Sequence, residues 1–272
     1  MRSAEGAAFD GEVVADIDRR LQLLSGREQI RVLLAVESGS RAWGFPSPDS
    51  DYDCRFIYAR RTQDYLSLFP ARDVIEEPFD RVLDIGGWDL AKALRLLLKG
   101  NAVVVEWLMS PFVYAGDDRF RAECLDLAHQ ALRPPAVARH YLHLGERQRR
   151  TYFADLRSIP LKKMFYALRP AVALRWLRMH DDRAIVPMHF PTLVAQTDLP
   201  GDVVALISDL MARKAATREL GTGPLPAPIG ALIDAEFTCA RTRWLSAASP
   251  PDPGARNAAD QLFRRSGGAQ QP

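Results

Sequence analysis

Four polar residues between two apolar runs have the types and the spacing for phosphate chemistry. Gly39 and Ser40 follow the apolar run that ends near Glu37, and Asp51 and Asp53 open the next one. Because successive side chains of a strand point to opposite faces, Asp51 and Asp53 are expected to share a face. Two carboxylates on one face repel each other unless a cation lies between them. Hard divalent ions such as Mg²⁺ take oxygen ligands of this kind, often together with substrate phosphates.

The Gly-Ser pair and a further acid extend this pattern toward a two-metal site. A turn at Gly39-Ser40 can offer backbone N–H groups and a hydroxyl to a phosphate. Asp84, flanked by apolar residues in a third run, has the setting of a third carboxylate, with Asp80 and Asp89 as alternatives nearby. Metal ions held by such acids can activate a hydroxyl and stabilise a leaving oxygen. Each signal alone has an ordinary explanation, since a Gly-Ser pair is commonly only a turn. The combination favours a site.

The elements that would position these residues alternate between helix and strand. Apolar residues at three- and four-residue spacing predict a helix over residues 11–25, which Gly26 would end. Continuous apolar runs predict three strands, at residues 31–37, 53–59 and 81–86, and residues 73–77 form either a short additional strand or a loop. From Trp88 the pattern is helical, with Lys99-Gly100 at its end.

The second half of the chain has a different pattern. From about Ala122 to Leu245 the segments are long, rich in Arg and mostly helical in period, without a clear strand. Pro170 is expected to kink the strongest of these helices or to divide it in two. The sequence therefore predicts an α/β (α+β) protein with a catalytic domain at residues 1–120, an all-helical domain at 121–248 and a flexible tail at 249–272.

Composition excludes several classes of protein. Apolar residues make up 47% of the chain, and 36 Lys or Arg against 34 Asp or Glu leave a formal charge of +2. These values exclude a disordered chain and a polycation that binds nucleic acid by charge alone. No apolar run is long enough for a transmembrane helix, and the first thirty residues lack the apolar core of a signal peptide, so we expect a cytoplasmic protein. The three cysteines fit reduced structural thiols.

The motifs together resemble the DNA polymerase β-like nucleotidyltransferase superfamily. Gly39-Ser40 followed by Asp51-x-Asp53 is similar to its signature, and the longer text SGSRAWGFPSPDSDYDCRFIY resembles a bacterial and phage branch, the RNA-repair-pathway polymerase-β-family proteins. The resemblance continues through GWDLAKALRLLLKGN, EWLMSP and KKMFYALRPAVALRW, over roughly residues 30 to 245. It implies a mixed central sheet, a helical C-terminal domain, and transfer of a nucleotidyl group from an NTP with Mg²⁺ (or Mn²⁺).

Carried over residue by residue, the resemblance assigns roles. Gly39 and Ser40 would hold the triphosphate, and Asp51, Asp53 and Asp84 would bind the metal ions. Three basic residues are further candidates for nucleotide binding. These are Arg41, which follows the Gly-Ser turn and could instead pair with Glu37 or Asp49, and Lys163 and Arg169, which lie at helical spacing with Lys162 and Tyr166.

The acceptor of the nucleotidyl group is open at this point. Between Arg147 and Arg183, ten Lys or Arg stand against three Asp or Glu, with aromatic residues interleaved. This stretch is either a face that binds RNA or a solvated helix surface with aromatic anchors. An RNA 3′ end is the first expectation, and a protein or a small molecule is the second. A nucleotide-binding regulatory or antitoxin-like module without turnover is the alternative from another class, and a protein partner is unknown.

Overall fold

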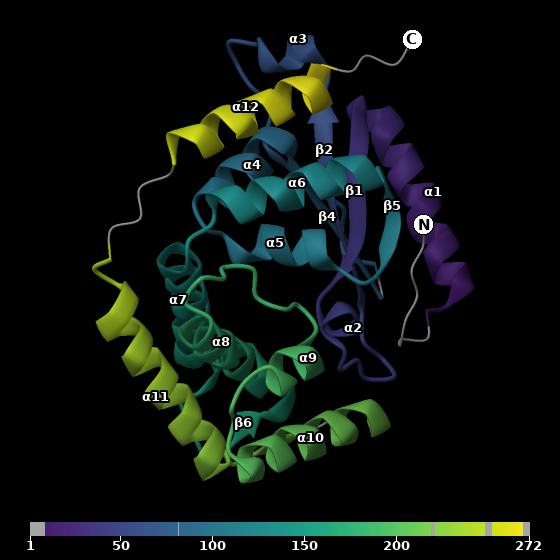
Figure 1. Cartoon of the computed structure of the whole chain (residues 1–272). Coiled ribbons are helices and arrows are strands. Elements are labelled where there is room, and N and C mark those ends of the chain that lie inside the picture. Colours follow the sequence, from purple (N-terminus) through teal and green to yellow (C-terminus); the bar gives the residue numbers. More distant parts are fainter. Residues whose placement is uncertain (1–8, 81, 219–220, 248–251, 269–272) are drawn as a thin grey trace.

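A five-stranded mixed sheet forms the centre of the N-terminal half (Figure 1). The computed structural model describes residues 9–80, 82–218, 221–247 and 252–268. The strands are β1 (Ile30–Ser38), β2 (Tyr52–Arg60), β3 (Val74–Glu76), β4 (Leu83–Asp89) and β5 (Val113–Gly116). Their spatial order is β3-β4-β2-β1-β5. The β2–β4 pair is parallel, whereas β1–β2, β1–β5 and β3–β4 are antiparallel.

The central strands β1 and β2 are buried on both faces because helices cover both. On one face α1 packs its apolar stripe against side chains such as Cys54, Phe56 and Tyr58. On the other face, Val36, Ile57 and Ala59 join a larger core that continues into the helical half. Continuous apolar runs, rather than alternating ones, are typical of strands covered in this way. The helices of this half are α1 (Gly11–Glu28), α2 (Ser40–Trp43), α3 (Thr62–Tyr65), α4 (Leu90–Leu98), α5 (Ala102–Met109) and α6 (Asp118–Ala131).

The helical half stands below the sheet in Figure 1. Its helices are α7 (Pro134–Tyr152), α8 (Leu161–Met179), α9 (Phe190–Ala195), α10 (Gly201–Ala216) and α11 (Ala227–Trp244), and a two-residue ladder joins β6 (Ile159–Pro160) to β7 (Thr222–Gly223). Pro170 does not divide α8, which is continuous and largely buried. Gly145 lets α7 approach α11 and α8 closely, because a Cβ at this position would lie 2.4 Å from Cζ of Phe237 and 3.0 Å from the Cβ of Pro170.

The sequence locates the central strands well and one helix end poorly. A mixed sheet followed by helices was predicted and is confirmed, and residues 73–77 do contain the short strand β3. Gly26 does not end α1, which continues to Glu28 and is capped by Gln29 in the left-handed conformation (φ 52°). Arg81, the predicted start of the third strand, lies outside the described residues.

The flexible tail predicted for residues 249–272 is wrong where the structure describes it. Helix α12 (Pro253–Gly268) returns to the N-terminal half and lies along α6 and α4 (Figure 1). Ala255, Ala259 and Leu262 are buried there. Their i, i+4, i+7 spacing is a helical stripe made mostly of small residues, which the Pro- and Gly-rich composition concealed. Residues 249–251 and 269–272 lie outside the described part, and the domain boundary at 120/121 stays a prediction.

None of the helices in the described residues has the length and hydropathy that a membrane span requires.

Candidate functional site

The Gly39-Ser40 turn places β1 directly against the carboxylate of Asp53. Gly39 has φ +75°, and a Cβ built on it would lie 2.1 Å from Oδ2 of Asp53. Glycine is therefore required here both by the backbone conformation and by the close approach. Ser40 then begins the short helix α2, and its hydroxyl donates to Oγ of Ser50 at 3.0 Å. Gly39 and Ser40, both predicted site residues, thus lie beside Asp53 at the end of the central strands β1 and β2.

Asp53 and Asp84 are neighbours across the parallel pair β2–β4. They occupy the same register position, and Arg55 on β2 bridges them. The Arg55 guanidinium donates to Asp84 at 2.6 and 3.1 Å and lies 3.4 Å from Oδ1 of Asp53. Asp51 lies just before β2, is exposed, and lines the same cavity as Asp53. The third carboxylate predicted from the sequence therefore lies beside the second one.

The two alternatives to Asp84 have other roles. Asp80 forms an ion pair with Arg20 of α1, on the outside of the sheet. Asp89 caps α4 by accepting from the N–H of Ala91 at 2.8 Å, and it also accepts from the Tyr65 hydroxyl at 3.2 Å. Neither carboxylate lines the cavity that Asp51 and Asp53 share.

Burial and repulsion between carboxylates raise the pKa of two acids at this site, Asp53 and Glu37. Burial raises the pKa of Asp53 to about 6, opposed by the Arg55 charge and increased by the charges of Asp84 and Asp51. Glu37, fully buried on β1, accepts from the N–H of Asp53 at 3.1 Å and from the Tyr114 hydroxyl. Burial raises the pKa of Glu37 to about 8. Glu37 was not among the predicted site residues. It is a buried acid on β1 whose carboxylate holds the backbone N–H of Asp53.

A cavity of about 140 Å³ opens in front of Asp51 and Asp53. Its N-terminal wall is formed by Gly39, Ser40, Trp43, Phe45, Ser50, Asp51 and Asp53. Its other wall comes from the helical half, with Lys162 and Tyr166 on α8 and Lys214 on α10. The two halves of the chain thus complete one cavity that has acids on one side and ammonium groups on the other.

Lys214 is the charged residue of this cavity that the sequence analysis did not identify. It is 2% exposed, and its Nζ donates to the carbonyl oxygen of Phe45 at 2.6 Å. Burial, the largest cause, and the neighbouring charge of Lys162 lower its pKa to about 8, while Asp49 opposes the shift. The sequence contains a pattern that marks Lys214 as unusual. Lys214 continues the stripe of Val203, Ile207 and Leu210 on α10, so a lysine occupies a core position of an apolar helix face.

Lys163 and Arg169, both predicted to bind nucleotide, lie outside the cavity wall. The Nζ of Lys163 lies 5.1 Å from the ring centroid of Tyr152 and 4.7 Å from that of Tyr166. Arg169 is buried, donates to Glu106 at 2.9 Å and lies 4.7 Å from the ring centroid of Trp43. Arg169 therefore supports a wall residue of the cavity without reaching the cavity itself.

Arg41 lies beside the loop between β1 and β2, outside the wall of the cavity that Asp51 and Asp53 share. Its guanidinium is 4.0 Å from the ring centroid of Tyr52, and it donates to the carbonyl oxygens of Ser50 at 2.8 Å and Asp51 at 3.3 Å. It lines a second cavity of about 800 Å³, which shares Ser50 with the smaller one. Arg41 thus fixes the backbone that carries Asp51.

The carboxylates of this site are suitable ligands for a hard divalent ion. Between Asp53 and Asp84, however, the positive charge is that of Arg55. Carboxylate oxygens are the ligands that Mg²⁺ prefers. Among the described residues, no three His, Cys, Asp or Glu side chains are grouped closely enough to hold a metal ion. Instead, Arg55 neutralises Asp53 and Asp84. A metal ion between Asp53 and Asp84 would have to take the place of Arg55.

Comparisons with known proteins match most of the chain. The model of the RNA repair pathway DNA polymerase beta family matches residues 13–265. An uncharacterized protein of Bacillus subtilis (strain 168), YcgL, is 41% identical over 191 residues, which cover 70% of this chain and 72% of that protein. The region that the family model matches includes both walls of the cavity.

Proposed function

The chain belongs to the RNA repair pathway DNA polymerase beta family, and from this premise we propose that it is a metal-dependent nucleotidyltransferase that moves an NMP from an NTP to a hydroxyl acceptor. The observation that carries the proposal is the cavity itself. Gly39 and Ser40, two acids and two buried or half-buried lysines line one space of about 140 Å³. Catalysis of phosphoryl-type transfer consists mainly of positioning and charge stabilisation, and this set of groups supplies both.

The triphosphate would lie between the Gly-Ser turn and the helical half. The absence of a side chain at Gly39 leaves room against Asp53, and Ser40 presents a hydroxyl. Lys162 and Lys214 face this turn from α8 and α10. A polyphosphate would give the buried ammonium of Lys214 an anionic partner in place of the Phe45 carbonyl oxygen alone, and charge-assisted hydrogen bonds of this kind are strong.

Asp51, Asp53 and Asp84 would hold the metal, Mg²⁺ or Mn²⁺. A bound ion of this type polarises phosphate oxygens and lowers the pKa of a hydroxyl. Arg55 neutralises Asp53 and Asp84 in the structure, and a bound ion would take over that role. Its long contact with Asp53, 3.4 Å, is weaker than its contact with Asp84, 2.6 Å, so the main adjustment is at Asp84.

The proposed reaction needs no covalent enzyme intermediate. The acceptor oxygen forms a bond to the α-phosphorus while the bond from that phosphorus to the bridging oxygen breaks. The hydroxyl proton is released to water, and pyrophosphate leaves. Lys162 and Lys214 offset the charge that develops on pyrophosphate.

An RNA 3′ end is the acceptor that we propose, in line with the description of the family. The larger cavity, which shares Ser50 with the catalytic one, offers the acceptor a separate approach past Arg41 and Tyr52. The basic stretch 147–183 gives limited support, because many of its charges have acidic partners. Arg149, Arg157, Arg169, Arg175 and Arg178 pair with carboxylates. A protein or small-molecule hydroxyl is therefore kept as the second acceptor to be tested.

The test is label transfer from each α-³²P-labelled NTP, with Mg²⁺ or Mn²⁺, to total RNA or to cell lysate. We expect the wild-type chain to label a macromolecule and the double variant Asp51→Asn, Asp53→Asn to label none. The matched control is Asp80→Asn, which removes a carboxylate of the same half that lies outside the cavity and should leave transfer unchanged. Nuclease or protease treatment of the product identifies the acceptor.

The outcomes separate the competing functions. Equal transfer by the wild type and the double variant would refute the site. If no label transfers but the wild type binds NTP and the double variant does not, the nucleotide-binding module without turnover is the correct function. Circular dichroism of the double variant shows whether a loss of transfer reflects the site or the fold.

A further inference from the structure

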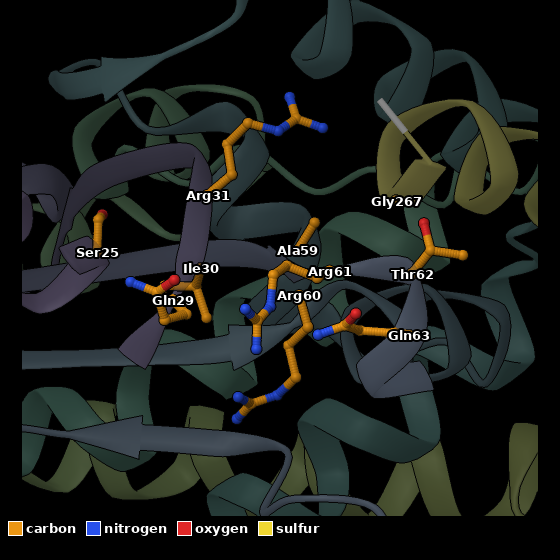
Figure 2. A pocket seen from close by; sticks show the side chains of 10 residues that line it. All are labelled: Ser25, Gln29, Ile30, Arg31, Ala59, Arg60, Arg61, Thr62, Gln63 and Gly267. Carbon is orange, nitrogen blue, oxygen red and sulfur yellow. The ribbon is translucent and has the colours of Figure 1, made fainter. Parts of the chain in front are cut away.

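Glu37 is the one buried acid among the described residues of the paired strands β1 and β2. It is 0% exposed and lies on the strand next to Asp53. At the opposite end of the same ladder, where Ile30 pairs with Arg60, the arginines are partly exposed, and Figure 2 shows Arg31 pointing away from Arg60. Burying an acid is costly unless it is well paired, so its presence at the end that carries the candidate site needs a reason.

Every polar group of Glu37 has a hydrogen-bond partner within the protein. Its N–H donates to the carbonyl oxygen of Phe112 at 3.0 Å, and its carbonyl oxygen accepts from the Ser110 hydroxyl at 2.6 Å. One carboxylate oxygen accepts from the N–H of Asp53 at 3.1 Å, and the other accepts from the Tyr114 hydroxyl. These four contacts fix both the backbone and the carboxylate of Glu37, which makes it a rigid acceptor for Asp53.

The two hydroxyl donors to Glu37 are themselves held in place. Tyr114 on β5 is 3% exposed, and its ring packs edge-on against that of Phe112, with the centroids 4.9 Å apart. Ser110 is 0% exposed, and its carbonyl oxygen accepts from the Arg121 guanidinium of α6 at 2.8 Å. The segment between α5 and β5 thus fixes Glu37 from one side, and Glu37 fixes the backbone of β2 on the other.

The position of the Asp53 backbone matters because its carboxylate lies in a narrow space. A Cβ on Gly39 would lie 2.1 Å from Oδ2 of Asp53, and the Arg55 guanidinium lies 3.4 Å from Oδ1. A small displacement of Asp53 therefore moves its carboxylate into the turn or away from Asp84, its neighbour across the β2–β4 pair. Residues that orient the ligands of a metal ion commonly change its affinity 10- to 100-fold when they are replaced.

We propose that Glu37 is a positioning residue for metal binding, which holds Asp53 through its backbone N–H in the orientation that a divalent ion requires. Glu37 acts as a hydrogen-bond acceptor, and neither its charge nor direct contact with the ion is needed, since it does not line the cavity. The proposal rests on the proposed function in one respect, because it takes Asp53 as a ligand of the ion.

The experiment measures binding of Mn²⁺ to the full chain at pH 8, without NTP, by electron paramagnetic resonance of the unbound ion. Glu37→Leu removes the acceptor but keeps a side chain of similar size, and it should weaken Mn²⁺ binding about tenfold or more. Glu37→Gln keeps an oxygen that accepts from the N–H of Asp53 and an NH₂ that donates to the Tyr114 oxygen, so its affinity should stay within about threefold of the wild type.

A matched pair of tyrosine variants decides the question if Glu37→Leu does not fold. Tyr114→Phe removes the hydroxyl that holds the Glu37 carboxylate. Tyr58→Phe removes a hydroxyl from the same face of the sheet, beside Arg60 at the other end of β2. We expect weaker Mn²⁺ binding in Tyr114→Phe and wild-type binding in Tyr58→Phe. Equal affinities in these two variants would overturn the proposal.

The remaining outcomes separate this proposal from the proposed function. Wild-type Mn²⁺ binding in Glu37→Leu would overturn the positioning role, and equal losses in Glu37→Leu and Glu37→Gln would overturn it by making charge the property that counts. Mn²⁺ binding that follows the expected order of variants, in a chain that transfers no label from NTP, would support the positioning role and refute only the transferase. Label transfer by the wild type with Mn²⁺ binding independent of Glu37 would refute only the positioning role.

Discussion

Arg169 and Lys214, two cations of the helical half, are buried near the cavity that Asp51 and Asp53 line. They differ in whether a carboxylate is paired with the charge. Arg169 on α8 has a side chain only 4% exposed, and the carboxylate of Glu106 lies 2.9 Å away. Lys214 on α10 is 2% exposed, and its hydrogen bond goes to the carbonyl oxygen of Phe45. A buried charge is costly unless it is paired, so Arg169 is balanced within the fold and Lys214 is not.

This difference separates a structural cation from one that is available to a ligand. Glu106 also accepts from the Tyr141 hydroxyl at 2.9 Å, and Arg169 donates to the carbonyl oxygen of Met188 at 3.2 Å, so the pair joins several segments. Lys214 instead lines the cavity and has a pKa lowered to about 8 by burial. A lysine whose charge is disfavoured in the unliganded protein gains most from an entering anion.

The largest expected effect comes from removing the acid of the balanced pair. Glu106→Gln leaves Arg169 buried with no carboxylate, and breaking a buried pair in this way costs about 3 kcal/mol of the free energy of unfolding. Urea denaturation followed by circular dichroism measures the loss. In the control, Glu123→Gln, the partner Arg119 is 81% exposed, and the change should stay within about 1 kcal/mol. Equal losses in the two variants would show that the Glu106–Arg169 pair is no more important than a surface pair.

The pH dependence of the free energy of unfolding tests whether the charge of Lys214 is unbalanced in the folded chain. The pKa of Lys214 is about 8 in the folded chain, below its ordinary value of 10.5, so between these values the unfolded chain binds more protons. The free energy of unfolding should therefore rise with pH from about 8 to 10.5, relative to the variant Lys214→Met, by on the order of 2 kcal/mol. Urea titrations of both proteins across this range measure the difference. A difference independent of pH would contradict an uncompensated lysine.

The sheet could be predicted from the sequence, and the closeness of the acids could be proposed, because both depend on local patterns. Apolar runs located the central strands, and the spacing of Asp51 and Asp53 after Gly39 marked the loop that brings them together. Asp84 could be proposed because it follows an apolar residue in the next strand of the sheet, and register then places it beside Asp53. These inferences use residues close in the chain or periodicity within one element.

The cavity's second wall depends on packing between distant segments, which local patterns do not contain. Lys162, Lys163, Tyr166 and Arg169 share helical spacing, yet the rotation of α8 places only Lys162 and Tyr166 at the cavity. Choosing Lys162 and Tyr166 instead of Lys163 and Arg169 would have required knowing which face of α8 meets α2. Lys214 comes from another helix, and only its position in an apolar stripe marks it.

Binding of an NTP tests whether Lys214 is the cation that contacts the ligand. Lys214→Met should weaken binding of an NTP about tenfold, equivalent to about 1.4 kcal/mol, without lowering the free energy of unfolding at pH 7. Lys163→Met is the matched control, because Lys163 is a lysine beside the cavity that does not line it, and its effect should be smaller. Fluorescence titration with a labelled NTP and Mg²⁺ provides both dissociation constants. A larger effect at Lys163 would return the nucleotide to the position that the sequence first favoured.

The smallest expected effect concerns the cation on the acid side of the cavity. Arg55 offsets Asp53 and Asp84 as Glu106 offsets Arg169, but Asp53 lines a cavity, so a metal ion can compete with the arginine there. Arg55→Gln should strengthen Mn²⁺ binding a few-fold at pH 8, where Asp53, with its pKa of about 6, is ionised. Electron paramagnetic resonance of unbound Mn²⁺ measures this without turnover, with Arg20→Gln, outside the cavity, as the control. Weaker Mn²⁺ binding in Arg55→Gln would mean that the arginine holds the two acids in place for the ion, and the parallel with the Glu106–Arg169 pair would then extend to both sides of the site.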